Sequence, residues 1–329
     1  MTPAQMTQVQ TVRGPVDSDA LGKTLMHEHI FVLTADVQAN HDEWDEQARI
    51  DDAVQKLTAL KDAGYGSIVD PTVIGLGRYI PRIEKIAQQV DLNIIVATGV
   101  YTYDTAPFYF KYRGPIPGIA DDLPDPMLGM FVRDITEGIP GTNVKAAFLK
   151  CAIDHQGMTP DVERIMRNVA RAHRQTGAPI TVHTHPGSQQ GLEAHRVLSA
   201  EGVEPGRVVL GHSGDTQDAD HLARLADLGY ILGFDRFGID VEASVEDRVK
   251  VAVELARRGY ADRMVLSHDA ACYIDWIDPI LLPANPNWHY LHIENDVLPA
   301  MRELGVTDDQ IDQMLVGNPR RYFENVGAY

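Results

Sequence analysis

Short apolar segments alternate with longer amphipathic segments along most of the chain. The apolar segments are rich in Val, Ile and Leu and show little polar alternation, as expected of strands that are buried on both faces. They cover residues 22–31, 66–72, 92–101, 144–152, 179–185, 207–212, 230–236 and 263–269. Helical spacing with typical cap residues marks the segments 49–64, 159–177, 216–229 and 244–259.

This alternation predicts a (β/α)8 TIM barrel of the α/β class. Eight repeats of strand and helix favour a closed parallel barrel over an open sheet. Residues 7–16 come before the first repeat and predict a short N-terminal β-hairpin that closes near Gly14 and Pro15. Because no linker-like or low-complexity segment interrupts the pattern, we expect a single domain over residues 1–329.

The composition argues against several kinds of protein. A formal net charge of −18 disfavours nucleic acid, whose phosphates require clustered Lys and Arg, and it equally disfavours an anionic membrane surface. The two cysteines, Cys151 and Cys272, are too few for a disulfide framework. The first residues lack the features of a signal peptide, and no apolar segment approaches the ~20 residues of a membrane-spanning helix. We expect a soluble, cytoplasmic protein.

Six polar side chains with metal-binding chemistry lie near the ends of five predicted strand segments or within them. The carboxyl ends of barrel strands converge on one rim, where active sites lie, so residues far apart in sequence would meet there. Two imidazoles and a carboxylate suit one divalent ion, and two further imidazoles suit a second ion. The residues concerned are His27, His29, Lys150, His183, His212 and Asp269.

Lys150 requires a chemical change to fit this site. A lysine ammonium cannot bind a metal and would be repelled by two dications. The amine can take up carbon dioxide, and the resulting carbamate (N6-carboxylysine) carries two oxygens that would bridge both ions. Lys145 is a less suitable bridging residue, because it lies at the amino end of the same segment and its odd separation from Lys150 points it the other way.

Several motifs contain these residues in a characteristic order. They are LMHEH, FLKCA, ITVHTH, VVLGHSGD, DRFG and LSHD, followed by NWHYLH and GNPRRYF nearer the C-terminus. With these motifs the chain resembles the phosphotriesterase family of the amidohydrolase superfamily, and more closely its phosphotriesterase-like lactonase branch. The likeness covers essentially the whole chain.

The resemblance implies a binuclear metal centre in a homodimer. It places His27, His29 and Asp269 on one ion and His183 and His212 on the other, with carboxylated Lys150 and a hydroxide between the two ions. Zinc, cobalt, iron and manganese all suit these ligands. One ion would polarise a carbonyl or phosphoryl oxygen while the bridging hydroxide attacks, and Asp269 would accept its proton.

The resemblance also suggests substrate-binding residues. Tyr101, or alternatively Tyr103, and Arg236 would lie beside the metals and place the substrate. Asp235 would orient Arg236 or pair with a ligand histidine, although an Asp–Arg pair at the rim can also be purely structural. The apolar, proline-rich segment 270–292 would line a channel for an acyl chain with Trp276 at its wall, or else would dock against the barrel or a second subunit.

The favoured function is hydrolysis of lactone rings, with N-acyl-homoserine lactones as substrates (quorum quenching) and weak activity on organophosphate triesters. A dedicated phosphotriesterase on the same scaffold is the first alternative. A mononuclear deaminase of the same superfamily is the second, and it would lack the bridging lysine at strand four. A barrel that binds a ligand without catalysis is the third, and the intact set of six ligand residues argues against it.

Other polar residues receive no catalytic role. A thiolate from Cys272 is not needed beside a metal hydroxide, and Cys151 should pack behind its strand. His185 and Glu28 lie next to ligands, but no ligand position is vacant for them. Five further histidines fall on predicted loops or helices away from the rim: His41, His155, His173, His195 and His221.

Overall fold

The computed structural model describes residues 7–40, 44–116, 118–324 and 327–329. Eight parallel strands form its central sheet, in the order β11-β10-β9-β8-β7-β6-β5-β3. This arrangement confirms the barrel fold that the alternating pattern predicted. The strands are β3 (Lys23–Leu25), β5 (Tyr65–Asp70), β6 (Asn93–Gly99), β7 (Phe148–Ala152), β8 (Ile180–His183), β9 (Val208–Gly211), β10 (Ile231–Phe234) and β11 (Met264–Leu266).

Backbone hydrogen bonds join the first and last strands and bring the sheet close to a closed barrel. The amide of Met26 lies 3.4 Å from the carbonyl of Leu266, and the amide of Asp269 lies 3.1 Å from the carbonyl of His27. Two candidate metal ligands therefore lie next to this junction.

The predicted first strand, residues 22–31, is interrupted in the structure. β3 ends at Leu25, and a second strand, β4 (His29–Val32), begins after a break of three residues and pairs with β12 (Ala271–Ile274). The sequence pattern predicts one continuous strand that carries both His27 and His29, and this prediction is wrong: His27 lies in the break and His29 begins β4. They nevertheless reach the same cavity.

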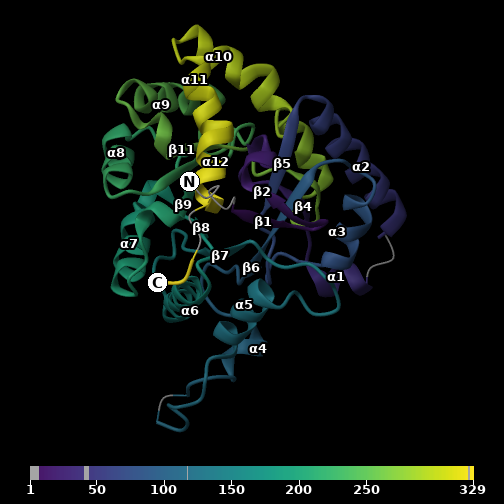
Figure 1. The fold of residues 1–329 in the computed structure, drawn as a ribbon, viewed down its shortest axis with the longest axis vertical. Coiled ribbons are helices and arrows are strands. Elements are labelled where there is room, and N and C mark those ends of the chain that lie inside the picture. The colour runs from purple at the N-terminus through teal and green to yellow at the C-terminus, as the bar shows by residue number, and fades with distance from the viewer. Residues whose placement is uncertain (1–6, 41–43, 117, 325–326) are drawn as a thin grey trace, which may run out of the picture.

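Helices surround the strands (Figure 1). Among the described residues no helix combines the length and the apolar character needed to cross a membrane. The α-helices are α1 (Ala35–Asn40), α2 (Glu46–Asp62), α3 (Ile80–Ala87), α4 (Phe108–Lys111), α5 (Pro126–Thr136), α6 (Pro160–Thr176), α7 (Gln190–Ala200), α8 (Ala219–Asp227), α9 (Val245–Arg257), α10 (Leu298–Glu303), α11 (Asp308–Asp312) and α12 (Asn318–Glu324).

Cap residues decide where the predicted helices begin. α6 and α9 start directly after Thr159 and Ser244, whose side chains accept hydrogen bonds from the first-turn amides, as predicted. α2 starts earlier than predicted because Asp45 caps it, and α8 starts later because Asp218 caps it. An aspartate cap close to the amphipathic stretch thus shifted both boundaries by a few residues.

The N-terminal hairpin forms as predicted, with its turn two residues earlier than expected. β1 (Gln8–Thr11) pairs with β2 (Gly14–Asp17), so Gly14 and Pro15 open the second strand instead of forming the turn. The amide of Val12 in the turn donates to the carbonyl of Ile94 on β6 (2.9 Å), which fastens the hairpin to the barrel.

Between β6 and α5 the chain leaves the barrel as an arm, defined here by the described residues 107–116 and 118–124. It begins with α4 and projects from the molecule at the end opposite α10 (Figure 1). Ile116 and Ala120 form an isolated antiparallel bridge within it.

Candidate active site

A cavity of about 270 Å³ opens at the carboxyl ends of the barrel strands. It collects side chains from all eight barrel repeats or from the loops that follow them, which the convergence of the strands in a barrel makes possible. The residues singled out from the sequence all line it: His27, His29, Tyr101, Lys150, His183, His212, Arg236, Asp269 and Trp276.

Asp269 is the centre of the first group of candidate ligands. Its Oδ1 lies 3.4 Å from Nε2 of His27 and 3.3 Å from Nε2 of His29. Ligand atoms of His27, His212 and Asp269 also lie within 4.8 Å of one another, a spacing that could hold a metal ion. Although burial alone would raise the pKa of the Asp269 carboxyl, the neighbouring histidines hold that pKa well below its ordinary value.

His29 sits in surroundings that favour a cation. Burial alone would lower its pKa, but hydrogen bonds to Asp269 and Asp70 raise the pKa to about 9. Its other ring nitrogen, Nδ1, lies 2.7 Å from the hydroxyl of Thr72. Two carboxylates therefore stabilise positive charge at this position, and Thr72 holds the ring.

His183 and His212 form the second group. Nδ1 of His183 lies 2.7 Å from Nε2 of His212, so one nitrogen of each ring faces the same point. Burial lowers the pKa of His183 to about 4 and also lowers that of His212 far below its ordinary value. Both rings are therefore neutral near pH 7 and offer a lone pair, as metal ligands must.

The backbone at two of these positions is strained. Among the described residues only three other than glycine have a positive φ angle, and two of them are His212 (64°) and Asp269 (53°). Strained conformations of this kind cluster at functional sites, because the surrounding structure must compensate their cost. The placement of these two candidate ligands therefore costs backbone conformational energy, which the surrounding structure offsets.

Lys150 is completely buried at the bottom of the cavity. Its Nζ lies 3.4 Å from Nε2 of His27. Burial lowers the pKa of the Lys150 amine to about 8 although Asp269 and Asp235 pull in the opposite direction. The amine therefore has an appreciable neutral fraction near pH 7, and the neutral form is the one that reacts with carbon dioxide. Lys145, by contrast, is only partly buried and donates to the carbonyl of Thr136.

Asp235 connects the two ligand groups from behind. Its Oδ2 lies 2.9 Å from Nδ1 of His27, and its Oδ1 lies 2.9 Å from Nδ1 of His212. Oδ1 also accepts from the amide of His212 (2.7 Å). Of the two roles expected for Asp235, the structure therefore shows pairing with ligand histidines, and this carboxylate orients one ring in each group.

Asp154 is a site residue that the sequence reading missed. Its Oδ2 lies 2.5 Å from Nε2 of His183, and its Oδ1 contacts the amide and Nδ1 of His155, each at 2.6 Å. His155 was expected to lie away from the rim, but the structure places it on the loop that follows β7, beside the cavity. Their position in the sequence could have indicated this, because Asp154 and His155 directly follow the predicted strand segment that ends at Ala152, and strand ends point to the active-site rim.

Arg236 lies against the ligand group and not only at the outer rim. Its Nε donates to Oδ2 of Asp269 (3.1 Å) and its Nη1 donates to Oδ2 of Asp215 (3.0 Å). The hydroxyl of Tyr101 lies 3.4 Å from Nδ1 of His183 and contacts the hydroxyl of Tyr103. Both candidate tyrosines therefore reach the site: the ring centroids of Tyr101 and Tyr103 lie 5.4 and 5.2 Å from that of His183, and the hydroxyl of Tyr101 contacts this ligand histidine.

An apolar wall closes one side of the cavity. The ring of Trp276 lies 6.2 Å from that of Tyr101, between centroids. Trp288 donates from its indole to the carbonyl of Asp269 (3.0 Å), which fixes the last loop over the site. Further apolar side chains of this wall are Val32, Leu76, Ile239, Val241, Ile274 and Ile277.

The residues without an expected catalytic role lie in structural positions. Cys151 is buried in the core, and burial raises the pKa of Cys272 to about 12, which does not favour a thiolate nucleophile. Glu28 is fully buried and joins the first strand segment to the loop after β11. His173, His195 and His221 lie on helices α6, α7 and α8, as expected, whereas His41 lies outside the described residues.

Comparisons with known proteins agree with this geometry. The model of the phosphotriesterase family matches residues 7–323. The solved structure of the phosphotriesterase from Mycobacterium tuberculosis is 53% identical, covers 98% of this chain and 100% of its own, and has a TM-score of 0.95. An aryldialkylphosphatase from Saccharolobus solfataricus is 37% identical, over 94% of this chain and 96% of its own.

A third similar protein links organophosphate hydrolysis to lactones. Its structure, described as molecular engineering of organophosphate hydrolysis activity from a weak promiscuous lactonase template, is 32% identical and has a TM-score of 0.87. The similarity extends over 96% of this chain and 99% of the other chain. The family model and these similarities over almost the full length lead to one conclusion. The chain belongs to the phosphotriesterase family and is a metal-dependent hydrolase.

Proposed function

We propose that this hydrolase, acting as one domain over residues 1–329, opens lactone rings and that N-acyl-homoserine lactones are its substrates. Hydrolysis of organophosphate triesters is then a weak side activity. The observation that carries the proposal is the cavity itself, in which Tyr101, Arg236 and Asp269 lie beside the candidate ligands under an apolar wall that contains Trp276. A cyclic ester with an acyl chain would match this cavity, because its polar ring would face Tyr101, Arg236 and Asp269 and its apolar chain would face the wall.

Two divalent ions, drawn from zinc, cobalt, iron or manganese, fit the donor atoms of this site. His27, His29 and Asp269 would hold one ion, and His183 with His212 would hold the other. Lys150, as a carbamate, would supply the oxygens between them. When bound, such a pair polarises a carbonyl oxygen and provides a water of lowered pKa. The neutral rings of His183 and His212 and the ionised carboxyl of Asp269 support this assignment.

Asp269 would accept a proton, and Arg236 would help to place the substrate. The carboxyl of Asp269 is ionised and faces the cavity, so it can accept the proton released when the ring ester is attacked. The guanidinium of Arg236 donates to this carboxyl and to Asp215, which holds it in one orientation toward the ring. Burial raises the pKa of Tyr101 far above its ordinary value, so its hydroxyl stays protonated and can donate to a substrate oxygen.

The apolar wall gives the acyl chain its place. Trp276 lies at the cavity and is 46% exposed, so a chain that packs on its ring would remove apolar surface from water. Leu281 and Ile280 lie further along the same loop in the 3-10 helix η5 (Pro279–Ala284) and are also exposed. A longer acyl chain can therefore bury more of this surface than a short one.

A dedicated phosphotriesterase is the alternative function, favoured by the similarity to the aryldialkylphosphatase. The same proton acceptor and polarising site suit a tetrahedral phosphorus. For a triester with short alkyl groups, however, the apolar wall beyond Trp276 has no evident use. The homodimeric state implied by the resemblance and the cytoplasmic location expected from the composition belong to the lactonase proposal as well.

A paired rate comparison tests the proposal. On one metal-loaded batch, kcat/KM is measured for a long-chain N-acyl-homoserine lactone and for an organophosphate triester. We expect the lactone to be preferred by several orders of magnitude. A triester preference would replace the lactonase by the phosphotriesterase, and no detectable rate on either substrate with both metals bound would refute both substrate classes.

The variant Trp276→Ala tests the acyl-chain wall separately. KM should rise more for a long-chain than for a short-chain lactone, since only the long chain reaches the tryptophan. Leu304→Ala, which removes an exposed leucine at the end of α10, serves as the control and should leave both KM values unchanged. Equal effects of Trp276→Ala on both lactones would place the acyl chain elsewhere.

A further inference from the structure

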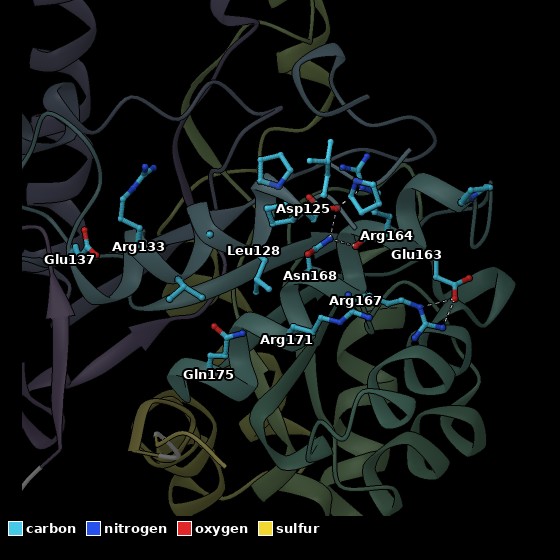
Figure 2. Close-up of a pocket in the computed structure, with 17 residues that line it drawn as sticks. Asp125, Leu128, Arg133, Glu137, Glu163, Arg164, Arg167, Asn168, Arg171 and Gln175 are labelled. Atoms are coloured by element: carbon cyan, nitrogen blue, oxygen red, sulfur yellow. Dashed lines mark hydrogen bonds and ion pairs between the residues drawn. The ribbon is translucent and has the colours of Figure 1, made fainter. Parts of the chain in front are cut away.

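Arg248, on α9, is the largest fully buried side chain among the described residues. Other arginines keep part of their side chain in water. Figure 2 shows Arg164, Arg167 and Arg171 along a hollow of about 1180 Å³ between α5 and α6, and these side chains are 23%, 32% and 51% exposed. A guanidinium that is removed from water costs free energy unless its charge is paired, so the partners of Arg248 indicate its role.

The main partner of Arg248 is the carboxylate of Asp215, on the loop that follows β9. Nε and Nη2 of Arg248 donate to Oδ1 of Asp215 at 3.0 and 2.7 Å, and Nη1 donates to the carbonyl of Ala243 at 2.7 Å. The other oxygen of Asp215, Oδ2, accepts from Nη1 of Arg236 (3.0 Å). Arg236 in turn donates from Nε to Oδ2 of Asp269 (3.1 Å). Charges of alternating sign therefore run in one chain from α9 to the candidate active site.

Arg236 lies between two cavities. One is the active-site cavity, and the other, of about 340 Å³, shares Tyr103, Arg236 and Glu242 with it. We refer to this second cavity as the side cavity. A long, flexible side chain with space on two sides stays in one orientation only if its polar atoms are held, because ordering it costs conformational entropy. The carboxylates of Asp215 and Asp269 hold the guanidinium of Arg236 in this way.

We propose that Arg248 is a positioning residue for hydrolysis. It holds Asp215, and through Asp215 it keeps the guanidinium of Arg236 turned toward Asp269 and the substrate. The inference rests on the proposed function, in which Arg236 helps to place the substrate, and it adds a residue that does not line the active-site cavity. Arg248 supplies two of the three hydrogen bonds from guanidinium groups to Asp215, so its loss would free this carboxylate to turn and Arg236 to enter the side cavity.

Two other routes connect Arg248 to the active site. Its hydrogen bond to the carbonyl of Ala243 holds the loop between β10 and α9, from which other side chains reach the cavity. The amide of Asp215 also donates to the carbonyl of His212 (3.0 Å), a candidate metal ligand. The route through Arg236 is favoured because each of its links joins charged groups, and such hydrogen bonds are the strong ones.

Crystal structures of the wild type and of Arg248→Met test the chain of contacts directly. Methionine retains an unbranched apolar side chain and removes the charge. We expect the guanidinium of Arg236 to leave Oδ2 of Asp269 and to turn into the side cavity. An Arg236 that keeps both carboxylate partners in the variant would overturn the proposal. This measurement needs no substrate, so its result does not depend on whether lactones are hydrolysed.

Steady-state kinetics of the metal-loaded protein tests whether the orientation of Arg236 matters for hydrolysis. The substrate is whichever of the lactone and the organophosphate triester the wild type hydrolyses faster. KM should rise about tenfold in Arg248→Met while kcat changes by less than about threefold, because a displaced Arg236 weakens substrate binding. Arg248→Lys keeps the charge and should recover part of the loss. An unchanged KM in Arg248→Met would overturn the positioning role, whereas a wild type inactive on both substrates would refute the proposed function alone.

A double-mutant cycle identifies the route. In an Arg236→Gln background, Arg248→Met should raise KM by less than about twofold, because the residue through which it acts is already missing. A tenfold rise in that background would assign the effect to the loop that carries Ala243 and would overturn the proposal. So would a fall in the bound metal of Arg248→Met, measured by mass spectrometry, which would assign the effect to His212.

Arg82→Met is the matched control. Arg82 is also buried (4% exposed) and donates to Glu46 (2.8 Å), but it does not line the active-site cavity. The control should lower the melting temperature as Arg248→Met does, yet leave KM and kcat unchanged. An equal rise of KM in Arg82→Met would reduce the role of Arg248 to general stability and overturn the proposal.

A second variant keeps the proposal testable if Arg248→Met does not fold. Asp215→Asn breaks the chain at its next link and preserves the size of the side chain. It should reproduce both the rise in KM and the displacement of Arg236. An Asp215→Asn variant with the KM of the wild type would contradict the proposal, because Arg248 reaches Arg236 through this carboxylate.

Discussion

Oδ2 of Asp154 lies 2.5 Å from Nε2 of His183, while Nδ1 of the same ring faces His212 at 2.7 Å. A carboxylate on one nitrogen of an imidazole fixes which nitrogen is free to bind a metal. β7, which carries Lys150, is therefore followed directly by Asp154, and this carboxylate orients the ligand His183 at the end of the neighbouring strand β8.

Asp154→Asn should weaken one metal position more than the other. Loss of the charge behind His183 should lower metal affinity there by about 10–100-fold, the usual effect of removing such a partner. Metal content after dialysis against a weak chelator should fall toward one ion per chain. Circular dichroism of the variant should match that of the wild type, because the position lies on a loop.

Asp235→Asn is the informative comparison for Asp154→Asn. Since Asp235 contacts one histidine from each ligand group, its loss should deplete both ions to a similar degree. Equal depletion of both ions by Asp154→Asn would contradict a specific role for Asp154 behind His183.

Metal reconstitution should depend on carbon dioxide through Lys150. After metal removal, reloading in buffer free of carbon dioxide should give little bound metal, and added bicarbonate should restore it. Lys145→Ala should keep this dependence, whereas Lys150→Ala should bind little metal with or without bicarbonate. A wild type that reloads fully without carbon dioxide would speak for a single-metal site of the deaminase kind.

Glu28→Gln should destabilise the junction between the first and last strands. The buried carboxylate of Glu28 accepts from Ser267 (2.8 Å), from the amide and Nδ1 of His268 (2.9 and 2.6 Å) and from the amide of Ala270 (3.0 Å). An amide cannot accept all four, so we expect a loss of about 2–4 kcal/mol in urea unfolding of the metal-free protein. The control variant Glu204→Gln, at an exposed position, should change the free energy of unfolding by less than about 0.5 kcal/mol.

His173 should make the fold less stable in acid. Burial lowers the pKa of His173, whose ring lies 2.7 Å from the carbonyl of Ala178 and 2.7 Å from the hydroxyl of Tyr329. Below a pH of about 6.5 the unfolded chain binds a proton that the folded chain resists, so stability falls as pH decreases through this range.

Melting temperatures between pH 8 and pH 5 test this assignment. His173→Gln should lower the melting temperature at pH 8 but flatten its dependence on pH. Tyr329→Phe removes one hydrogen bond and keeps the histidine, so it should lower the melting temperature while retaining most of the slope. An unchanged slope in His173→Gln would assign the acid sensitivity to other groups.

Much of the architecture could be predicted from local patterns. A buried strand needs a continuous apolar run and a helix needs apolar spacing and caps, so segments such as 179–185 and 159–177 identify themselves. Strand ends converge in a barrel, and for this reason the sequence pattern predicts that His27, Lys150, His183 and Asp269 meet.

The tertiary structure decided what depends on contacts between distant segments. The interruption of the first strand, the bridge from Asp235 to His27 and the contact of Asp154 with His183 have no local signature, because they result from how neighbouring strands pack. The same holds for the hollow between α5 and α6. Sequence by itself determined which side chains reach the rim, whereas packing decided which atoms face one another there.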